Sequence, residues 1–177
     1  MLLAPALVAL ILADRKDPLY VAAAVFVAGA ATDGLDGYVA RRYATTTRTG
    51  QWLDPLADKV LVAAPILALA SLGRFPWWAA VIIVVRELLV SALRVVLGLR
   101  GRSLPASRGA KVKTTLQILA ITLYILPLGS GAGSVKLAFL VAAVVMTVST
   151  GALYAVEAGR WLRRVDRTVP HDGAGPE

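Results

Sequence analysis

Cysteine is absent from the 177 residues of this chain, and histidine occurs once, as His171. Without cysteine the chain has no disulfide, no thiol nucleophile and no thiolate metal site. Charged residues are also scarce, at 17%, where a soluble domain carries roughly a quarter. Hydrophobic residues make up 58% of the chain, so the composition indicates an integral membrane protein.

Apolar segments separated by short polar connections predict an all-α, polytopic membrane protein with six transmembrane helices. The expected helices cover residues 2–13, 19–43, 51–72, 77–99, 114–128 and 136–162, and the fifth extends back toward Lys111. The first is too short to cross a hydrocarbon core of ~30 Å, so we expect it to be a truncated helix. We expect one membrane domain over residues 1–165 and a polar, disordered cytoplasmic tail over residues 166–177.

The net charge of +8 comes from basic residues that lie beside the apolar segments. This placement favours anionic lipid headgroups as partners and disfavours nucleic acid. Arginine and lysine gather near residues 41–48, 100–113 and 160–167, which the positive-inside rule assigns to the cytoplasm. We therefore expect a multi-pass protein of a bacterial inner membrane, with its site at the cytoplasmic face.

Four aspartates stand at regular spacings near two of the expected helix ends. Asp33 and Asp36 share one helix face, and Asp54 and Asp58 share a face of the next helix. Acids at membrane depth are costly and mark functional sites. Clustered carboxylates need cations to remain ionised together, and an all-oxygen set suits Mg²⁺, with Mn²⁺ as a possible substitute.

Small and basic residues accompany these acids. Gly37 and Ala40 leave room on the face of Asp33 and Asp36, and Arg41 supplies a guanidinium fork suited to phosphate oxygens. This set suits two divalent cations that grip a diphosphate, which indicates phosphoryl-group transfer. A divalent-cation transporter is an alternative from another class, but it predicts acids spread through the bilayer depth rather than collected at one edge.

The complete pattern is Asp-x-x-Asp-Gly-x-x-Ala-Arg, eight residues, then Gly-x-x-x-Asp-x-x-x-Asp. It resembles the signature of the CDP-alcohol phosphotransferases at every fixed position, namely Asp33, Asp36, Gly37, Ala40, Arg41, Gly50, Asp54 and Asp58. Residues 53–60, 86–94 and 109–117 further resemble stretches of the phosphatidylglycerophosphate synthases of this family. The resemblance covers about residues 2–165.

The resemblance implies a homodimer that transfers a phosphatidyl group from CDP-diacylglycerol to sn-glycerol 3-phosphate and releases CMP. The implied ligands of two Mg²⁺ ions are Asp33, Asp36, Asp54 and Asp58. Asp58 is also the implied general base for the acceptor hydroxyl. The residues expected at the CDP-diacylglycerol site are Gly37, Ala40, Arg41, Thr47 and Gly50.

The acceptor side of the site is less sharply marked. Arg86, Lys111 and Lys113 are candidates for binding the acceptor phosphate. For Arg86, pairing with another helix is an equally good interpretation. Because neighbours on a helix do not face each other, Arg86 and Glu87 are not expected to form a simple mutual pair. Inositol phosphate and phosphatidylglycerol remain alternative acceptors, which would make the chain a phosphatidylinositol-phosphate synthase or a cardiolipin synthase.

Overall fold

The structure, a computed structural model, describes the backbone of residues 3–43, 50–99 and 108–166 and the side chains of residues 3–32, 59–99, 109, 111–129 and 131–160. Every element in the described backbone is a helix, so the expected all-α class is confirmed there. The helices are α1 (Leu3–Leu12), α2 (Lys16–Tyr43), α3 (Gly50–Ser71), α4 (Trp77–Leu99), α5 (Arg108–Ile125), a short 3₁₀ turn (Ser130–Ala132) and α6 (Gly133–Asp166).

Three helices extend beyond an expected boundary, because the charged residues at those ends are also helical. Helix α5 begins at Arg108, slightly before the expected extension toward Lys111, because lysine and alanine are good helix formers. Helix α2 begins at Lys16 and holds Pro18 in its first turn, where a missing N–H costs little. Helix α6 runs on to Asp166.

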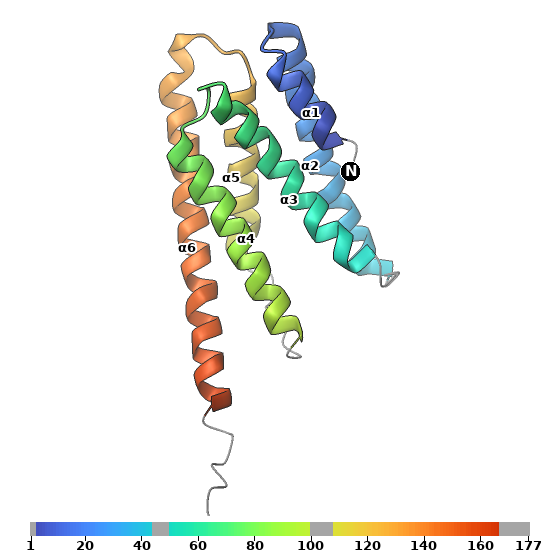
Figure 1. The fold of residues 1–177 in the computed structure, drawn as a ribbon, viewed down its shortest axis with the longest axis vertical. Coiled ribbons are helices and arrows are strands. Elements are labelled where there is room, and N and C mark those ends of the chain that lie inside the picture. The colour runs from blue at the N-terminus through green and yellow to red at the C-terminus, as the bar shows by residue number, and fades with distance from the viewer. Residues whose placement is uncertain (1–2, 44–49, 100–107, 167–177) are drawn as a thin grey trace, which may run out of the picture.

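The helices form a bundle with two distinct ends (Figure 1). The α1–α2 and α3–α4 turns and the α5–α6 connection lie at the upper end of the view. Helices α2, α4 and α6 finish, and α3 begins, toward the lower end. Helix α5 packs against α2, α3 and α6, while α4 packs against α3 and α6. The turns that carry the four aspartates, late in α2 and early in α3, therefore lie toward the same end of the bundle.

A tight turn fixes the upper end. Gly73 follows α3 with a φ of 68°, a left-handed conformation that glycine adopts without steric cost. The N–H of Arg74 then donates to the carbonyl of Leu69 at 2.9 Å, which closes the helix end. The Arg74 Nη1 also donates to Asp14 Oδ1 at 2.7 Å and so ties this turn to the α1–α2 turn.

The apolar core joins all six α-helices. Its largest fully buried side chains include Leu7, Ile11, Leu19, Phe26, Ile66, Leu69, Phe75, Ile83, Ile121, Ile125 and Leu140. The ring of Phe75 meets that of Tyr124 edge-on, with 4.8 Å between the centroids. The buried polar side chains are different in kind and position: all lie on α4, α5 and α6, at Glu87, Lys113, Gln117, Thr147 and Thr150.

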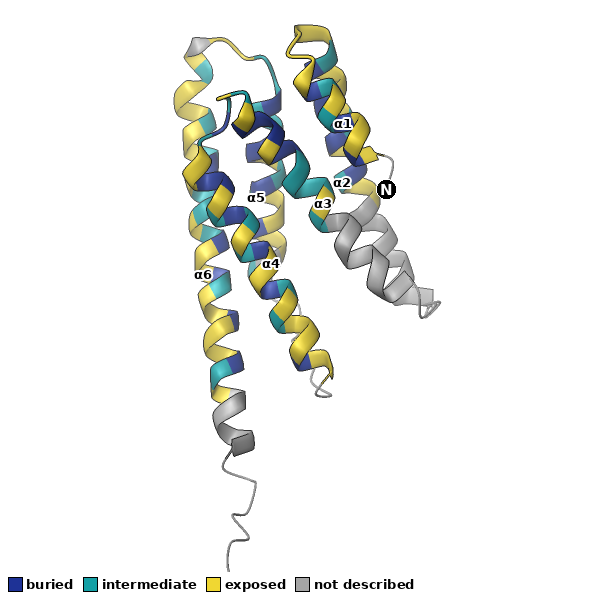
Figure 2. Cartoon of the chain, in the orientation of Figure 1, coloured by how far each residue is buried: buried dark blue, intermediate teal, exposed yellow. Residues whose placement is uncertain are grey.

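Much of the outer face of α4 and α6 is exposed (Figure 2), and many of the exposed residues there are large and hydrophobic. On α6, Leu137, Val141, Val145 and Val148 recur at three or four residues and are each about half exposed or slightly less. Within the described residues one helix is long and apolar enough to cross a membrane, at Gly133–Arg160. The six expected spans are therefore not confirmed as a set and stay a prediction.

Candidate functional site

The four aspartates lie on helical backbone. Asp33 and Asp36 belong to α2, and Asp54 and Asp58 belong to α3, as expected from their spacing. Their side chains lie outside the described residues, as do those of Gly37, Ala40, Arg41 and Gly50, and Thr47 lies outside the described backbone. Among the side chains that are described, no three metal-ligating residues gather. The metal and nucleotide sites therefore stay predictions.

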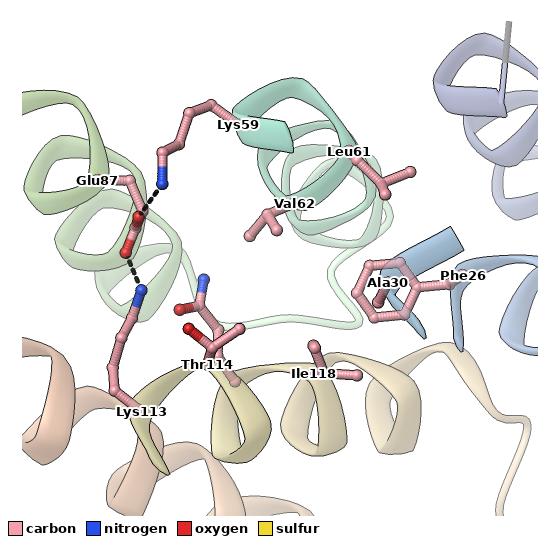
Figure 3. Close-up of a pocket in the computed structure, with 10 residues that line it drawn as sticks. Phe26, Ala30, Lys59, Leu61, Val62, Glu87, Lys113, Thr114 and Ile118 are labelled. Atoms are coloured by element: carbon pink, nitrogen blue, oxygen red, sulfur yellow. Dashed lines mark hydrogen bonds and ion pairs between the residues drawn. The ribbon is translucent and has the colours of Figure 1, made fainter. Parts of the chain in front are cut away.

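A cavity of about 120 Å³ opens between α2, α3, α4 and α5 (Figure 3). Its lining residues are Phe26, Ala30, Lys59, Leu61, Val62, Glu87, Lys113, Thr114, Gln117 and Ile118. Position 33 lies one helical turn beyond Ala30, and position 58 lies one turn before Leu61 and Val62. The helix faces that line the cavity thus continue directly into the turns that carry the aspartates.

Glu87 joins three helices at one wall of this cavity. The Lys59 Nζ on α3 donates to Glu87 Oε2 at 2.7 Å. The Lys113 Nζ on α5 donates to Glu87 Oε1, so the two lysines reach the carboxylate from opposite sides (Figure 3). Glu87 is 8% exposed and Lys113 is 5% exposed, so their pairing offsets the cost of burying both charges.

Arg86 extends this network to α6. Its Nε donates to the Thr147 carbonyl at 3.0 Å, and its Nη2 donates to Thr150 Oγ1 at 2.7 Å. Its Nη1 donates to Glu87 Oε1 at 2.9 Å. The expectation that Arg86 and Glu87 would not pair was wrong, because the long guanidinium reaches around the helix to its neighbour. A Cβ at Gly151 would lie 3.3 Å from Arg86 Cγ, so the missing side chain gives the arginine its space.

Gln117 lies one turn after Lys113 on α5 and also lines the cavity. It is 3% exposed, and its Oε1 is buried without a hydrogen-bond partner in the described part of the chain. A buried amide oxygen without a partner is costly, since almost all such atoms in proteins are hydrogen-bonded. Gln117 thus places a buried amide, whose oxygen has no partner in the described part of the chain, at the wall of this cavity.

The three candidates for the acceptor phosphate occupy different surroundings. Lys113 lines the cavity, whereas Arg86 bonds to α6 and Glu87. Lys111 is exposed on α5 and is not part of the cavity wall. The interpretation of Arg86 as a residue that pairs with another helix is confirmed.

Sequence reasoning missed Lys59 and Gln117 as residues of this cavity. A signal was available for Lys59, because it directly follows Asp58 in the pattern and places a cation early in an apolar helix. For Gln117 the signal was its place at the end of residues 109–117, one of the stretches that resemble the family, whereas its spacing alone does not distinguish it from a polar residue near the start of a helix. Its burial follows only from the packing of α5 against α2, α3 and α6.

A family profile described as CDP-alcohol phosphatidyltransferase matches residues 1–149. The chain belongs to this family. A relative from Mycobacterium tuberculosis, named probable phosphatidylglycerophosphate synthase, is 40% identical over 149 residues, which cover 84% of this chain and 71% of the relative. This CDP-alcohol phosphatidyltransferase is also similar to two proteins named CDP-diacylglycerol–glycerol-3-phosphate 3-phosphatidyltransferase. That of Rickettsia felis is 39% identical over 75% of each chain. That of Bacillus subtilis is 39% identical over 59% of this chain and 54% of the relative.

Proposed function

We propose that the protein transfers the phosphatidyl group of CDP-diacylglycerol to sn-glycerol 3-phosphate and releases CMP, as a phosphatidylglycerophosphate synthase of phospholipid synthesis. The observation that carries this proposal is the family signature between Asp33 and Asp58, which this chain matches at all eight fixed positions. Relatives of the chain are named for this reaction. The cavity supports it, since two ammonium groups line a pocket beside the turns that carry the aspartates.

The donor set fits divalent cations. Asp33 and Asp36 on α2 and Asp54 and Asp58 on α3 supply only carboxylate oxygens, the ligands that Mg²⁺ prefers. These residues would hold two Mg²⁺ ions, which neutralise the charge of a diphosphate when bound, and Mn²⁺ is a possible substitute. The contacts between α2 and α3 keep the two pairs on neighbouring helices.

In the proposed reaction Asp58 accepts the proton of the acceptor's terminal hydroxyl. That oxygen then forms a bond to the phosphorus of the phosphatidyl group. The bond between this phosphorus and the bridging oxygen breaks, and CMP leaves with that oxygen. Gly37, Ala40, Arg41, Thr47 and Gly50 are the residues proposed to bind the CDP-diacylglycerol headgroup.

The acceptor's phosphate is proposed to bind at the cavity wall formed by Lys59 and Lys113. Two ammonium groups held by one carboxylate favour an anion there. Arg86 contributes by holding Glu87 and α6, and Lys111 remains available on the exposed face of α5 for an anion that approaches from outside.

We further propose a multi-pass membrane location with the site at the cytoplasmic face. The buried residues of α4 to α6 include charges and an amide, while many of their exposed residues are leucine and valine, as expected for helices that face lipid. Helix α4 spans about 34 Å at 1.5 Å per residue, enough for a hydrocarbon core. Its charged Arg86, Glu87 and Arg94 reduce its hydropathy, yet Arg86 and Glu87 bond within the bundle. The implied homodimer stays a prediction.

The test is release of CMP from CDP-diacylglycerol by the detergent-purified protein with Mg²⁺. Glycerol 3-phosphate, inositol phosphate and phosphatidylglycerol are offered separately. We expect release with glycerol 3-phosphate alone. Release with only one of the others assigns the chain to a sister activity of the same family, and release with none of them contradicts the proposal.

A further inference from the structure

The side-chain amide of Gln117 is a buried polar group whose oxygen accepts no hydrogen bond from the described residues. The residue is 3% exposed. Burying such an acceptor costs about 1–3 kcal/mol, so sequences without a use for it tend to place an apolar residue instead. The cavity is the place where the missing partner can enter, since Gln117 is part of its lining.

The residues around Gln117 in the cavity restrict which ligand could donate a hydrogen bond to its oxygen. Lys113 lies one turn before Gln117 on the same helix, and its ammonium group borders the same cavity together with Lys59. Phe26, Ile118 and Val62 supply apolar walls. A small ligand that fits this arrangement has an anionic group for the ammonium groups and an uncharged hydroxyl within about one helical turn, ~5 Å, of it.

We propose that Gln117 recognises the hydroxyl of the acceptor that does not react, the C2 hydroxyl of glycerol 3-phosphate, and thereby selects this acceptor. The inference rests on the proposed function. The amide oxygen accepts a hydrogen bond from that hydroxyl while Lys59 and Lys113 bind the phosphate. Acceptors without this hydroxyl leave the buried oxygen without a partner, and sites of this kind reject such analogues more strongly than sites that merely fit a shape.

The test compares glycerol 3-phosphate with 3-hydroxypropyl phosphate, which has the same phosphate and terminal hydroxyl but no C2 hydroxyl. The kcat/KM of both acceptors is measured for the wild type and for Gln117→Met, an unbranched apolar replacement of similar size. We expect the wild type to prefer glycerol 3-phosphate at least tenfold, about the value of one hydrogen bond. In Gln117→Met the preference should fall to within about twofold, through loss of glycerol 3-phosphate activity alone.

Thr147→Val is the matched control. Thr147 is also fully buried with an unpartnered hydroxyl in the described residues, but it is not part of the cavity lining. We expect this variant to keep the preference between the two acceptors. Loss of the preference in Thr147→Val, or an equal loss of activity on both acceptors in Gln117→Met, would show that Gln117 acts through the fold and would overturn the proposal.

Two further measurements separate this inference from its premises. Thermal unfolding of Gln117→Met should not fall below that of the wild type, because an unpaired buried amide is removed. Calorimetric binding of the two phosphates to the wild type and to Gln117→Met tests recognition without turnover. If the wild type releases no CMP with glycerol 3-phosphate but binds it at least tenfold more tightly than the analogue, and Gln117→Met loses that preference, the proposed function fails while Gln117 keeps its role. Equal binding of the two phosphates overturns the role of Gln117.

Discussion

At the scale of single residues, Glu87 holds the buried charges of the bundle together. Its carboxylate accepts from Lys59, Lys113 and Arg86, which come from three different helices. Removing one partner of a buried ion pair leaves the other charge buried without compensation, which is strongly destabilising. Glu87 is therefore expected to matter for folding as well as for the arrangement of the cavity wall.

We expect Glu87→Gln to lower the free energy of unfolding by about 3 kcal/mol, because it removes the carboxylate that accepts from all three of these cations. The measurement is unfolding in detergent, monitored by circular dichroism. Asp14→Asn is the matched control, since it breaks the exposed Arg74–Asp14 pair, worth at most about 1 kcal/mol. Equal losses in the two variants would contradict the structural role of Glu87.

For Asp58 the expected effect is on catalysis. Asp58→Asn should lower kcat by about a hundredfold or more, because the amide cannot accept the proton of the acceptor hydroxyl. Its unfolding transition should stay close to that of the wild type. The check is the rate of CMP release under saturating substrates, and full activity in this variant would remove Asp58 from the role of base.

The four aspartates and their helices were predictable from the sequence, because spacing on a helix fixes which residues share a face. The cavity wall was not. Lys59 and Glu87 are separated by 28 residues, and their bond depends on how α3 packs against α4. Arg86 shows the same limit: its adjacency to Glu87 argued against a pair, yet the reach of its side chain allows one. Spacing rules describe faces of one helix and not the length of side chains.

At the scale of elements, α4 and α6 are fastened by arginines on one side of α4. Arg86 bonds to Thr147 and Thr150, and Arg94 donates to the Tyr154 hydroxyl at 3.0 Å and lies 5.0 Å above its ring. Glycine at position 151 permits the close approach, since a Cβ there would crowd Arg86. The position of α6 is thus linked through Arg86 to Glu87 and the cavity.

This link predicts opposite outcomes for two glycines of α6. Gly159→Ala should leave stability unchanged or raise it by up to about 1 kcal/mol, because nothing lies within 4 Å of the added Cβ and alanine favours a helix. Gly151→Ala should be less stable than Gly159→Ala by about 1 kcal/mol, since Arg86 must shift and weaken its bonds to α6. The thermal unfolding midpoints of the two variants decide this, and equal midpoints would contradict the packing role of Gly151.

At the scale of the whole molecule, Glu87, Thr147 and Thr150 are buried, whereas many leucine and valine side chains on α4 and α6 are exposed. The bundle also has one end with tight turns and another at which α2 ends and α3 begins (Figure 1). The sequence predicted the helices and their order, whereas the boundaries of α5 and α6 depended on charged residues that a helix accommodates. The proposed orientation in a bilayer rests on the basic connections and stays a prediction.

The absence of cysteine makes this orientation testable by labelling. A cysteine at Gly131, in the exposed connection between α5 and α6, should react with an impermeant maleimide on intact cells. A cysteine at Ser103, in the basic connection after α4, should react only after permeabilisation. The reverse pattern would place the aspartates on the outer side of the membrane and contradict the proposed orientation.

The most direct measurement follows radiolabelled glycerol 3-phosphate into the lipid phase with the purified protein. The proposed function predicts that label enters chloroform-soluble lipid only when CDP-diacylglycerol and Mg²⁺ are both present, in equal amount to the CMP released. Chelation of the metal should stop both together. CMP release without labelled lipid would indicate hydrolysis rather than transfer, and label in lipid without CDP-diacylglycerol would contradict the assigned donor.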